Sequence, residues 1–75
     1  MRRLIEEHAR ANGVPTGLVD RVVRQESGYR PAARNGPYYG LMQIPPRTAA
    51  AMGYAGPAEG LLDAETNLRY GVKYL

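Results

Sequence analysis

The sequence predicts a small all-α domain, and three observations support this prediction. Apolar residues recur at helical spacing in residues 2–12, in residues 18–29 and again from Leu68 to Leu75. Turns rich in Gly and Pro separate these segments, as expected between helices. No stretch alternates apolar and polar residues as a half-buried strand would. With 75 residues, the chain is long enough for one domain at most.

The composition argues against several classes of protein. The chain has no cysteine and one histidine, His8, so we expect no disulfide, no metal site and no cofactor. The net charge of +3 comes mainly from scattered arginines. No basic run is interleaved with aromatic residues, so we expect no nucleic-acid partner, whereas an anionic polymer would suit this charge. Six tyrosines, without Phe or Trp, suit a half-hydrated groove for a polar ligand.

The two ends of the sequence suggest that it is part of a longer protein. No apolar run is long enough to span a membrane, and the first residues lack the apolar core of a signal peptide. Residues 70–75 end inside a helical pattern without a glycine stop. We therefore expect a domain that is incomplete at its C-terminus, with any export signal outside this sequence.

The segment of residues 18–29 is predicted to be an amphipathic helix that ends by presenting a carboxylate. Its apolar stripe has two pairs of residues at one-turn spacing: Leu18 with Val22, and Val19 with Val23. Glu26 falls on the same stripe, so its side chain is expected on the buried face. Thr16 is expected to cap the start of this helix, and Gly28 suits the left-handed position after its end.

Burial disfavours the charged form of a carboxylate, and this would suit Glu26 to act as a general acid near neutral pH. Two alternatives remain open on the pattern alone. Glu26 pairs with Arg30 or Arg34, or fraying at the helix end leaves it hydrated.

The middle of the chain is predicted to carry ligand contacts. Residues 30–40 form one long irregular stretch with a turn at Asn35-Gly36-Pro37, and a loop beside a carboxylate is a common place for binding residues. The alternative is a plain surface connector. Residues 40–44 are expected to form a short helical turn that buries Leu41 and Ile44. Gln43 then either caps backbone groups or faces a ligand.

The second half is predicted to contain two further helices. Pro46 suits the first turn of a helix that ends at Gly53, and residues 54–60 form a loop. Asp63 is a clear N-cap for the last helix. The buried face of that helix is predicted to contain Leu68, Gly71, Val72 and Leu75. Gly71 is expected to mark close approach of another backbone, and Asn67 to make structural hydrogen bonds.

Several of these segments together resemble the catalytic domain of soluble lytic transglycosylases. They are Glu26-Ser27-Gly28-Tyr29, Gly40-Leu41-Met42-Gln43-Ile44, Thr48-Ala49, and Asn67 with Gly71 and Tyr74-Leu75. The resemblance covers roughly residues 12 to 75. It implies a lysozyme-like fold of the goose type, with residues 1–75 forming one partial domain of this family.

The resemblance also implies an activity, namely cleavage of peptidoglycan glycan strands between N-acetylmuramic acid and N-acetylglucosamine. Glu26 matches the position of the family's single catalytic acid and base, and the expected product carries a 1,6-anhydromuramoyl end. Residues 30–58 contain no acid, so a mechanism with one carboxylate is what the sequence permits. The implied location is the bacterial cell envelope or periplasm.

Five residues are predicted to contact the glycan: Ser27, Asn35, Tyr39, Met42 and Gln43. Ser27, Met42 and Gln43 match family positions that line the cleft, although Ser27 also suits a helix-end hydrogen bond and Met42 the core. Tyr38 and Tyr39 are candidates for stacking on sugar rings. The sequence departs from the family at two places, Pro37-Tyr38-Tyr39 and Pro45-Pro46, and Asn35 is the nearest equivalent of a serine found in many members.

Two other functions remain open. A goose-type muramidase would use water and leave a reducing end, and it would need a second carboxylate outside this sequence. A non-catalytic module of a phage or secretion protein would bind the wall without cleaving it. A carboxylate on an apolar face argues against the second, because burying it without a use destabilises the fold.

Overall fold

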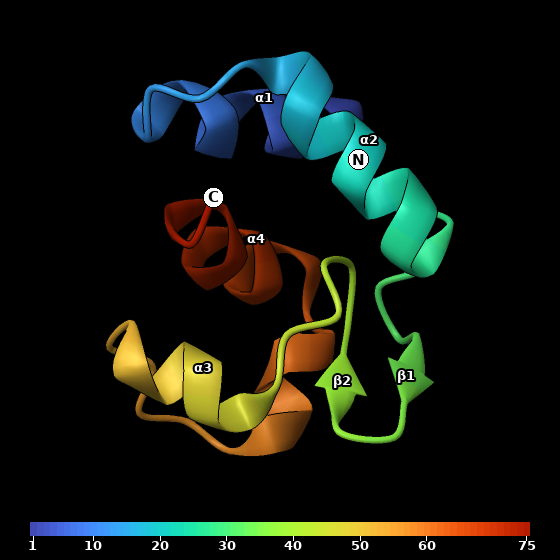
Figure 1. Cartoon of the computed structure of the whole chain (residues 1–75), viewed down its shortest axis with the longest axis vertical. Coiled ribbons are helices and arrows are strands. Elements are labelled where there is room, and N and C mark those ends of the chain that lie inside the picture. Colours follow the sequence, from blue (N-terminus) through green and yellow to red (C-terminus); the bar gives the residue numbers. More distant parts are fainter.

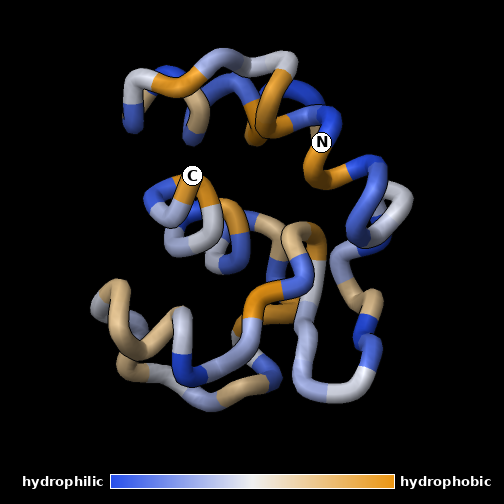
Figure 2. Tube along the Cα trace, viewed as in Figure 1, coloured by the Kyte–Doolittle hydropathy of each residue, from blue (hydrophilic) through white to orange (hydrophobic).

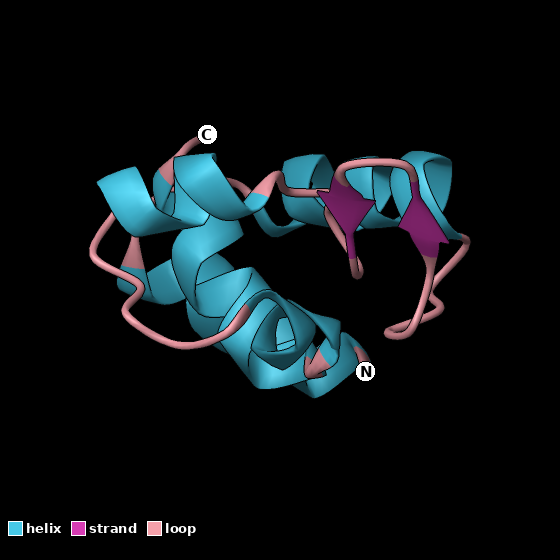
Figure 3. Cartoon of the chain, turned by 90° about the horizontal axis from the view of Figure 1, so that it is seen from below, coloured by secondary structure: helices cyan, strands magenta, loops and turns pink.

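The computed structural model describes residues 1–75, and helices dominate it, as predicted. The elements in order are α1 (Arg2–Ala11), α2 (Thr16–Ser27), β1 (Arg34–Asn35), β2 (Tyr38–Tyr39), α3 (Pro46–Ala51), the 3-10 helix η1 (Ala58–Leu62) and α4 (Ala64–Lys73). In Figure 1, α1 and α2 lie on one side of the molecule, α3, η1 and the hairpin lie on the other, and α4 lies between them. Figure 3 shows both strands at one edge of the molecule. No helix is long and apolar enough to cross a membrane.

Helices α1 and α2 pack against each other across a short turn, and each buries one narrow face. Val19 and Val23 of α2 are completely buried. The helix begins at Thr16, whereas Pro15 occupies the N-cap position with extended backbone and no side-chain hydrogen bond is made there. The predicted cap by Thr16 is therefore wrong, because a capping side chain must precede the first helical residue. Gly28, with φ of 61° and ψ of 34°, ends the helix in the predicted left-handed conformation.

A β-hairpin replaces most of the irregular stretch that was predicted for residues 30–40. Arg34 pairs with Tyr39, and Asn35 pairs with Tyr38, in an antiparallel register. Gly36 has a φ of 59°, as a type II′ turn requires of the first of its two central residues. The predicted turn is thus confirmed, but strands of two residues are too short to show alternation in a sequence.

The segment after β2 is a tight loop, so the predicted helical turn is wrong. The Tyr39 and Ile44 backbones bond to each other in both directions, at 3.2 and 2.9 Å, and close the loop between them. Gln43 has a φ of 53°, which a right-handed helix cannot accommodate. Leu41 and Ile44 are nevertheless buried as predicted, with 0% and 6% of their surface exposed.

The second half agrees with the prediction at α3 and α4 and adds η1, which was not predicted. The Asp63 side chain accepts hydrogen bonds of 3.0 Å from the backbone N–H and the hydroxyl of Thr66, so the predicted N-cap is confirmed. These bonds hold the pKa of Asp63 below its usual range. Leu75 is 47% exposed, contrary to prediction, because α4 ends at Lys73 and Leu75 no longer follows its buried face.

One apolar core connects all the helices. Figure 2 shows that the segment between β2 and α3 contains some of the most hydrophobic parts of the chain. The fully buried large apolar side chains are Ile5, Val19, Val23, Leu41, Leu61, Leu68 and Val72.

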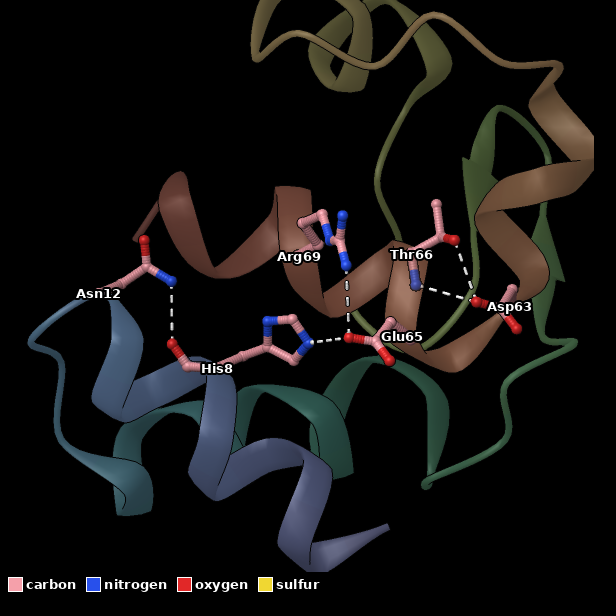
Figure 4. Close-up of polar contacts among 6 residues, drawn as sticks. All are labelled: His8, Asn12, Asp63, Glu65, Thr66 and Arg69. Carbon is pink, nitrogen blue, oxygen red and sulfur yellow. Dashed lines mark hydrogen bonds and ion pairs between the residues drawn. The ribbon is translucent and has the colours of Figure 1, made fainter.

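A polar contact also joins the two sides of the molecule. His8 Nε2 of α1 lies 3.2 Å from Glu65 Oε2 of α4, and Arg69 Nη2 lies 3.6 Å from the same oxygen (Figure 4).

Candidate active site

A cavity of about 250 Å³ lies where α2, the loop after β2, the start of α3 and the end of α4 meet. The residues that line it are Val22, Glu26, Met42, Gln43, Ile44, Pro45, Thr48, Gly71, Tyr74 and Leu75. Its walls therefore bring together three of the predicted site residues: Glu26, Met42 and Gln43.

Glu26 lies at the edge of the apolar stripe rather than within it. Val19, Val23 and Ser27 form the buried centre of the α2 face, at four-residue spacing. In the neighbouring row of the helix, Leu18 is 39% exposed and Glu26 is also exposed. Val22 of this row packs against the edge of the core and lines the cavity together with Glu26. The prediction that Glu26 is buried is therefore wrong, because apolar residues at helical spacing do not show which row is central.

The Glu26 carboxylate has no partner within the chain. Its predicted alternative partners are engaged elsewhere: Arg30 Nε donates to the Ser27 carbonyl at 3.3 Å, and the Arg34 guanidinium lies 4.5 Å from the centre of the Tyr39 ring. None of the ion pairs of the structure includes Glu26. A hydrated carboxylate without a partner is free to bind a ligand or to exchange a proton with one.

The opposite wall is fixed by Asn67, which is completely buried on α4. Its Oδ1 accepts a hydrogen bond of 2.9 Å from the Met42 backbone N–H, and its Nδ2 donates at 2.8 Å to the carbonyls of Tyr39 and Leu61. The predicted structural role of Asn67 is thus confirmed. The carbonyl of Met42 accepts no backbone hydrogen bond.

The Gln43 side chain holds the loop and the hairpin together. Its Nε2 donates to the carbonyls of Gly40 and Ala33 at 2.8 and 3.2 Å. Its Oε1 accepts a hydrogen bond of 2.8 Å from Asn35 Nδ2. Of the two alternatives left open by the sequence, these contacts support the capping of backbone groups. They also compensate the strain of a positive φ at Gln43.

The other predicted contact residues do not line the cavity. Ser27 is 4% exposed, and its hydroxyl donates to the Val23 carbonyl at 3.0 Å, one turn back in α2. Tyr39 is 7% exposed and is covered by Arg34. Neither of them, nor Asn35, is among the cavity residues.

Side chains, and not the other backbone that the sequence predicted, approach Gly71 of α4 closely and shape the cavity there. A Cβ atom at this position would lie 2.6 Å from Met42 Sδ and 2.7 Å from Ile44 Cδ1. Val22 and Thr48 line the cavity without having been predicted to do so. The four-residue spacing of Leu18, Val22 and Glu26 is the signal that could have identified Val22.

A larger cavity, of about 440 Å³, lies between the first turns of α1 and α2 and is lined in part by Asp20 and Tyr29. The Tyr29 hydroxyl donates to both oxygens of the Asp20 carboxylate at 3.0 Å, so this acid is already engaged. The smaller cavity is the better candidate for an active site, because its carboxylate is free.

A lysozyme-like helical domain that presents a free carboxylate at a cavity wall is the class of protein that this fold and site define. The chain belongs to the transglycosylase SLT domain family, which it matches over residues 3–75. It is 35% identical over 81 residues to soluble lytic murein transglycosylase from Escherichia coli K12, and equally to that from Escherichia coli O157:H7. The alignment covers 96% of this chain but 12% of each relative, so the chain spans about one eighth of their length.

Proposed function

We propose that this chain is part of a peptidoglycan lytic transglycosylase, and that residues 1–75 lie within a single SLT domain. The observation that carries the proposal is the free carboxylate of Glu26 at the wall of a cavity, in a chain of this family. The substrate is the glycan strand of the bacterial cell wall, and the place of action is the cell envelope. The bond cleaved joins N-acetylmuramic acid to N-acetylglucosamine.

The proposed reaction uses Glu26 twice. As an acid, it gives its proton to the glycosidic oxygen while the bond from that oxygen to C1 of the muramoyl residue breaks. The N-acetyl group of the substrate stabilises C1. As a base, Glu26 then takes the proton of the C6 hydroxyl, whose oxygen bonds to C1. The product is a 1,6-anhydromuramoyl end, and no water is consumed.

The composition of the cavity supports a mechanism with one carboxylate. Glu26 is the sole acid among the residues that line it. Inverting and retaining glycosidases use a second carboxylate on the other side of the bond. The next acid after residue 58 is Glu59, which lies on η1 outside the cavity, and Asp63 caps α4.

The Glu26 carboxylate is exposed in the chain alone, so we expect the bound glycan to exclude water from it. A sugar seated between Glu26 and the loop of Met42 and Gln43 excludes water from the carboxylate, and this favours the protonated form. We expect the free carbonyl of Met42 to accept a hydrogen bond from the sugar. Contacts from Ser27, Asn35 and Tyr39 to the substrate stay predictions.

The test is a digest of purified peptidoglycan with the 75-residue chain and with the Glu26→Gln variant, analysed by mass spectrometry. We expect anhydromuropeptides from the unsubstituted chain and a loss of at least roughly 100-fold in the variant, as for removal of a general acid. Glu59→Gln is the matched control, because this exposed glutamate lies outside the cavity, and its activity should be unchanged.

Each other result points to one of the alternatives. Reducing-end products would contradict the transglycosylase mechanism and favour a muramidase. Binding of the glycan without any product, equal in the unsubstituted chain and in Glu26→Gln, would indicate a wall-binding module.

A further inference from the structure

A second groove lies beside the Glu26 cavity, between residues of the hairpin turn and of the start of α3. Its volume is about 450 Å³, and it is lined by Pro37, Tyr38, Pro45, Pro46 and Arg47. These residues come from two short segments, Pro37-Tyr38 and Pro45-Pro46-Arg47. Tyr38 was a predicted candidate for stacking on a sugar ring, whereas the other four residues were not among the predicted contacts with the glycan.

The groove adjoins the Glu26 cavity, since Pro45 lines both of them. A linear polymer whose scissile bond lies beside Glu26 can therefore reach the groove by passing over Pro45. This proximity makes the groove a candidate subsite of the same substrate.

The lining of the groove combines flat apolar surfaces with one free cation. Tyr38 is 48% exposed, and its ring together with the proline rings can cover the C–H face of a pyranose. Arg47 is exposed and takes part in none of the ion pairs of the structure. A guanidinium binds a carboxylate through two parallel hydrogen bonds.

The groove is also rigid, which lowers the entropy lost when a ligand binds. Its three prolines have fixed φ angles. Tyr38 belongs to the hairpin, whose other strand is tied to Gln43 by Asn35. Arg47 provides the one long flexible side chain, at the rim.

From these observations we propose that the groove of Tyr38 and Arg47 is a subsite for a carboxylate-bearing sugar. Tyr38 packs on the sugar ring, and Arg47 pairs with the carboxylate. Within the proposed function, on which this inference rests, that sugar is a muramoyl residue next to those at the cleavage point. Its carboxylate belongs either to the lactyl group of a bare muramoyl residue or to a peptide stem.

The test measures binding rather than turnover, with Glu26→Gln as the background so that no ligand is consumed. Three soluble tetrasaccharides of alternating N-acetylglucosamine and N-acetylmuramic acid serve as probes. One carries free lactyl carboxylates, one carries peptide stems, and one has its lactyl carboxylates converted to methyl amides. Dissociation constants come from titrations followed by NMR at low and at physiological ionic strength.

We expect Arg47→Ala to weaken binding of a carboxylate-bearing probe by roughly 3- to 10-fold, and less so as salt is added, as for an exposed charge pair. Binding of the methyl-amide probe should not change. Arg47→Lys should restore part of the loss, and Tyr38→Ala should weaken binding of all three probes. Arg10→Ala is the matched control, because Arg10 is exposed and unpaired but lies on α1 away from the groove.

The probe whose binding is weakened by Arg47→Ala identifies the source of the carboxylate, which is either the lactyl group or the peptide stem. Equal affinity for charged and amide probes, with no effect of Arg47→Ala, would overturn the subsite. This result is distinct from failure of the proposed function, which appears as absence of anhydromuropeptides in the digest. Arg47-dependent binding without product would retain the subsite and reject the transglycosylase.

Discussion

Asn67 joins three separate parts of the chain from a completely buried position on α4. Its amide satisfies the backbone of Met42, Tyr39 and Leu61, which belong to the loop, to β2 and to η1. A buried polar group left without a partner destabilises a protein by about 1–3 kcal/mol. We therefore expect Asn67→Ala to lower the free energy of unfolding by about 3 kcal/mol or more, because three such groups lose their partner.

Urea unfolding followed by circular dichroism measures this effect. Asn12→Ala is the matched control, since the amide of Asn12 donates to the His8 carbonyl at 2.9 Å on the exposed surface. Its unfolding free energy should change by less than about 0.5 kcal/mol. Similar unfolding midpoints for the two variants would contradict the role given to Asn67.

At the scale of single residues, the sequence predicted the chemical role of a side chain better than it predicted how exposed that side chain is. Asp63 as a cap was predictable, because its partner Thr66 lies in the first turn of the same helix. Asn67 as a structural residue was predictable from its place beside the apolar face of α4, but its partners Met42 and Tyr39 were not, because they lie far away in the sequence. The exposure of Glu26 was not, since it depends on which row of α2 faces the core. The hydrogen bond from Asn35 to Gln43 closes a loop and has no signal in residue spacing.

At the scale of elements, Gly71 sets how closely α4 approaches the loop of the active site. Alanine favours a helix by about 1 kcal/mol over glycine, but its Cβ would overlap Met42 and Ile44. Overpacking of this kind usually destabilises by about 1–3 kcal/mol. The net loss is therefore about 0–2 kcal/mol, and we expect Gly71→Ala to lower the midpoint of thermal unfolding by up to roughly 15 °C.

The control for this prediction is Gly17→Ala in α2, where an added Cβ would have no neighbour within 4 Å. That variant should unfold at the same or a higher temperature, because only helix propensity changes. An unchanged midpoint in Gly71→Ala would show that the loop can yield. Weaker binding of the glycan would then show that the loop of Met42 has moved, since Met42 lines the cavity.

The elements that the sequence predicted are those built from local periodicity. The helices have apolar residues at regular spacing and end at Gly or begin at Pro or Asp. The hairpin and the loop from Gly40 to Ile44 are instead determined by contacts with Asn67, which lies on α4, and by the Gln43 side chain, which ties the loop to the hairpin side at Ala33. A side chain at Gly40 would overlap Asn67 and the Leu61 carbonyl, and this constraint exists only once α4 is in place.

At the scale of the whole molecule, α1 and α4 are the two helices that hold the site-bearing α2 against the rest. Their shared polar contact is that of His8 with Glu65, at 3.2 Å, and the His8 side chain is 12% exposed (Figure 4). Glu65 is half exposed and is shared with Arg69, so water and a second cation weaken the contact. A modest coupling between the two helices is therefore expected.

A double-mutant cycle of His8→Ala and Glu65→Ala measures this coupling from the free energies of unfolding. We expect about 0.5 to 1 kcal/mol, at the upper end for partly exposed pairs, because His8 is largely enclosed. The control cycle is Arg2→Ala with Glu6→Ala, a pair at 3.8 Å in which the Arg2 side chain is 90% exposed, and its coupling should not exceed about 0.3 kcal/mol. Strictly additive effects of His8 and Glu65 would show that apolar packing alone joins α1 to α4. The position of Glu26 relative to Met42 would then depend on Ile5 and its core neighbours rather than on this contact.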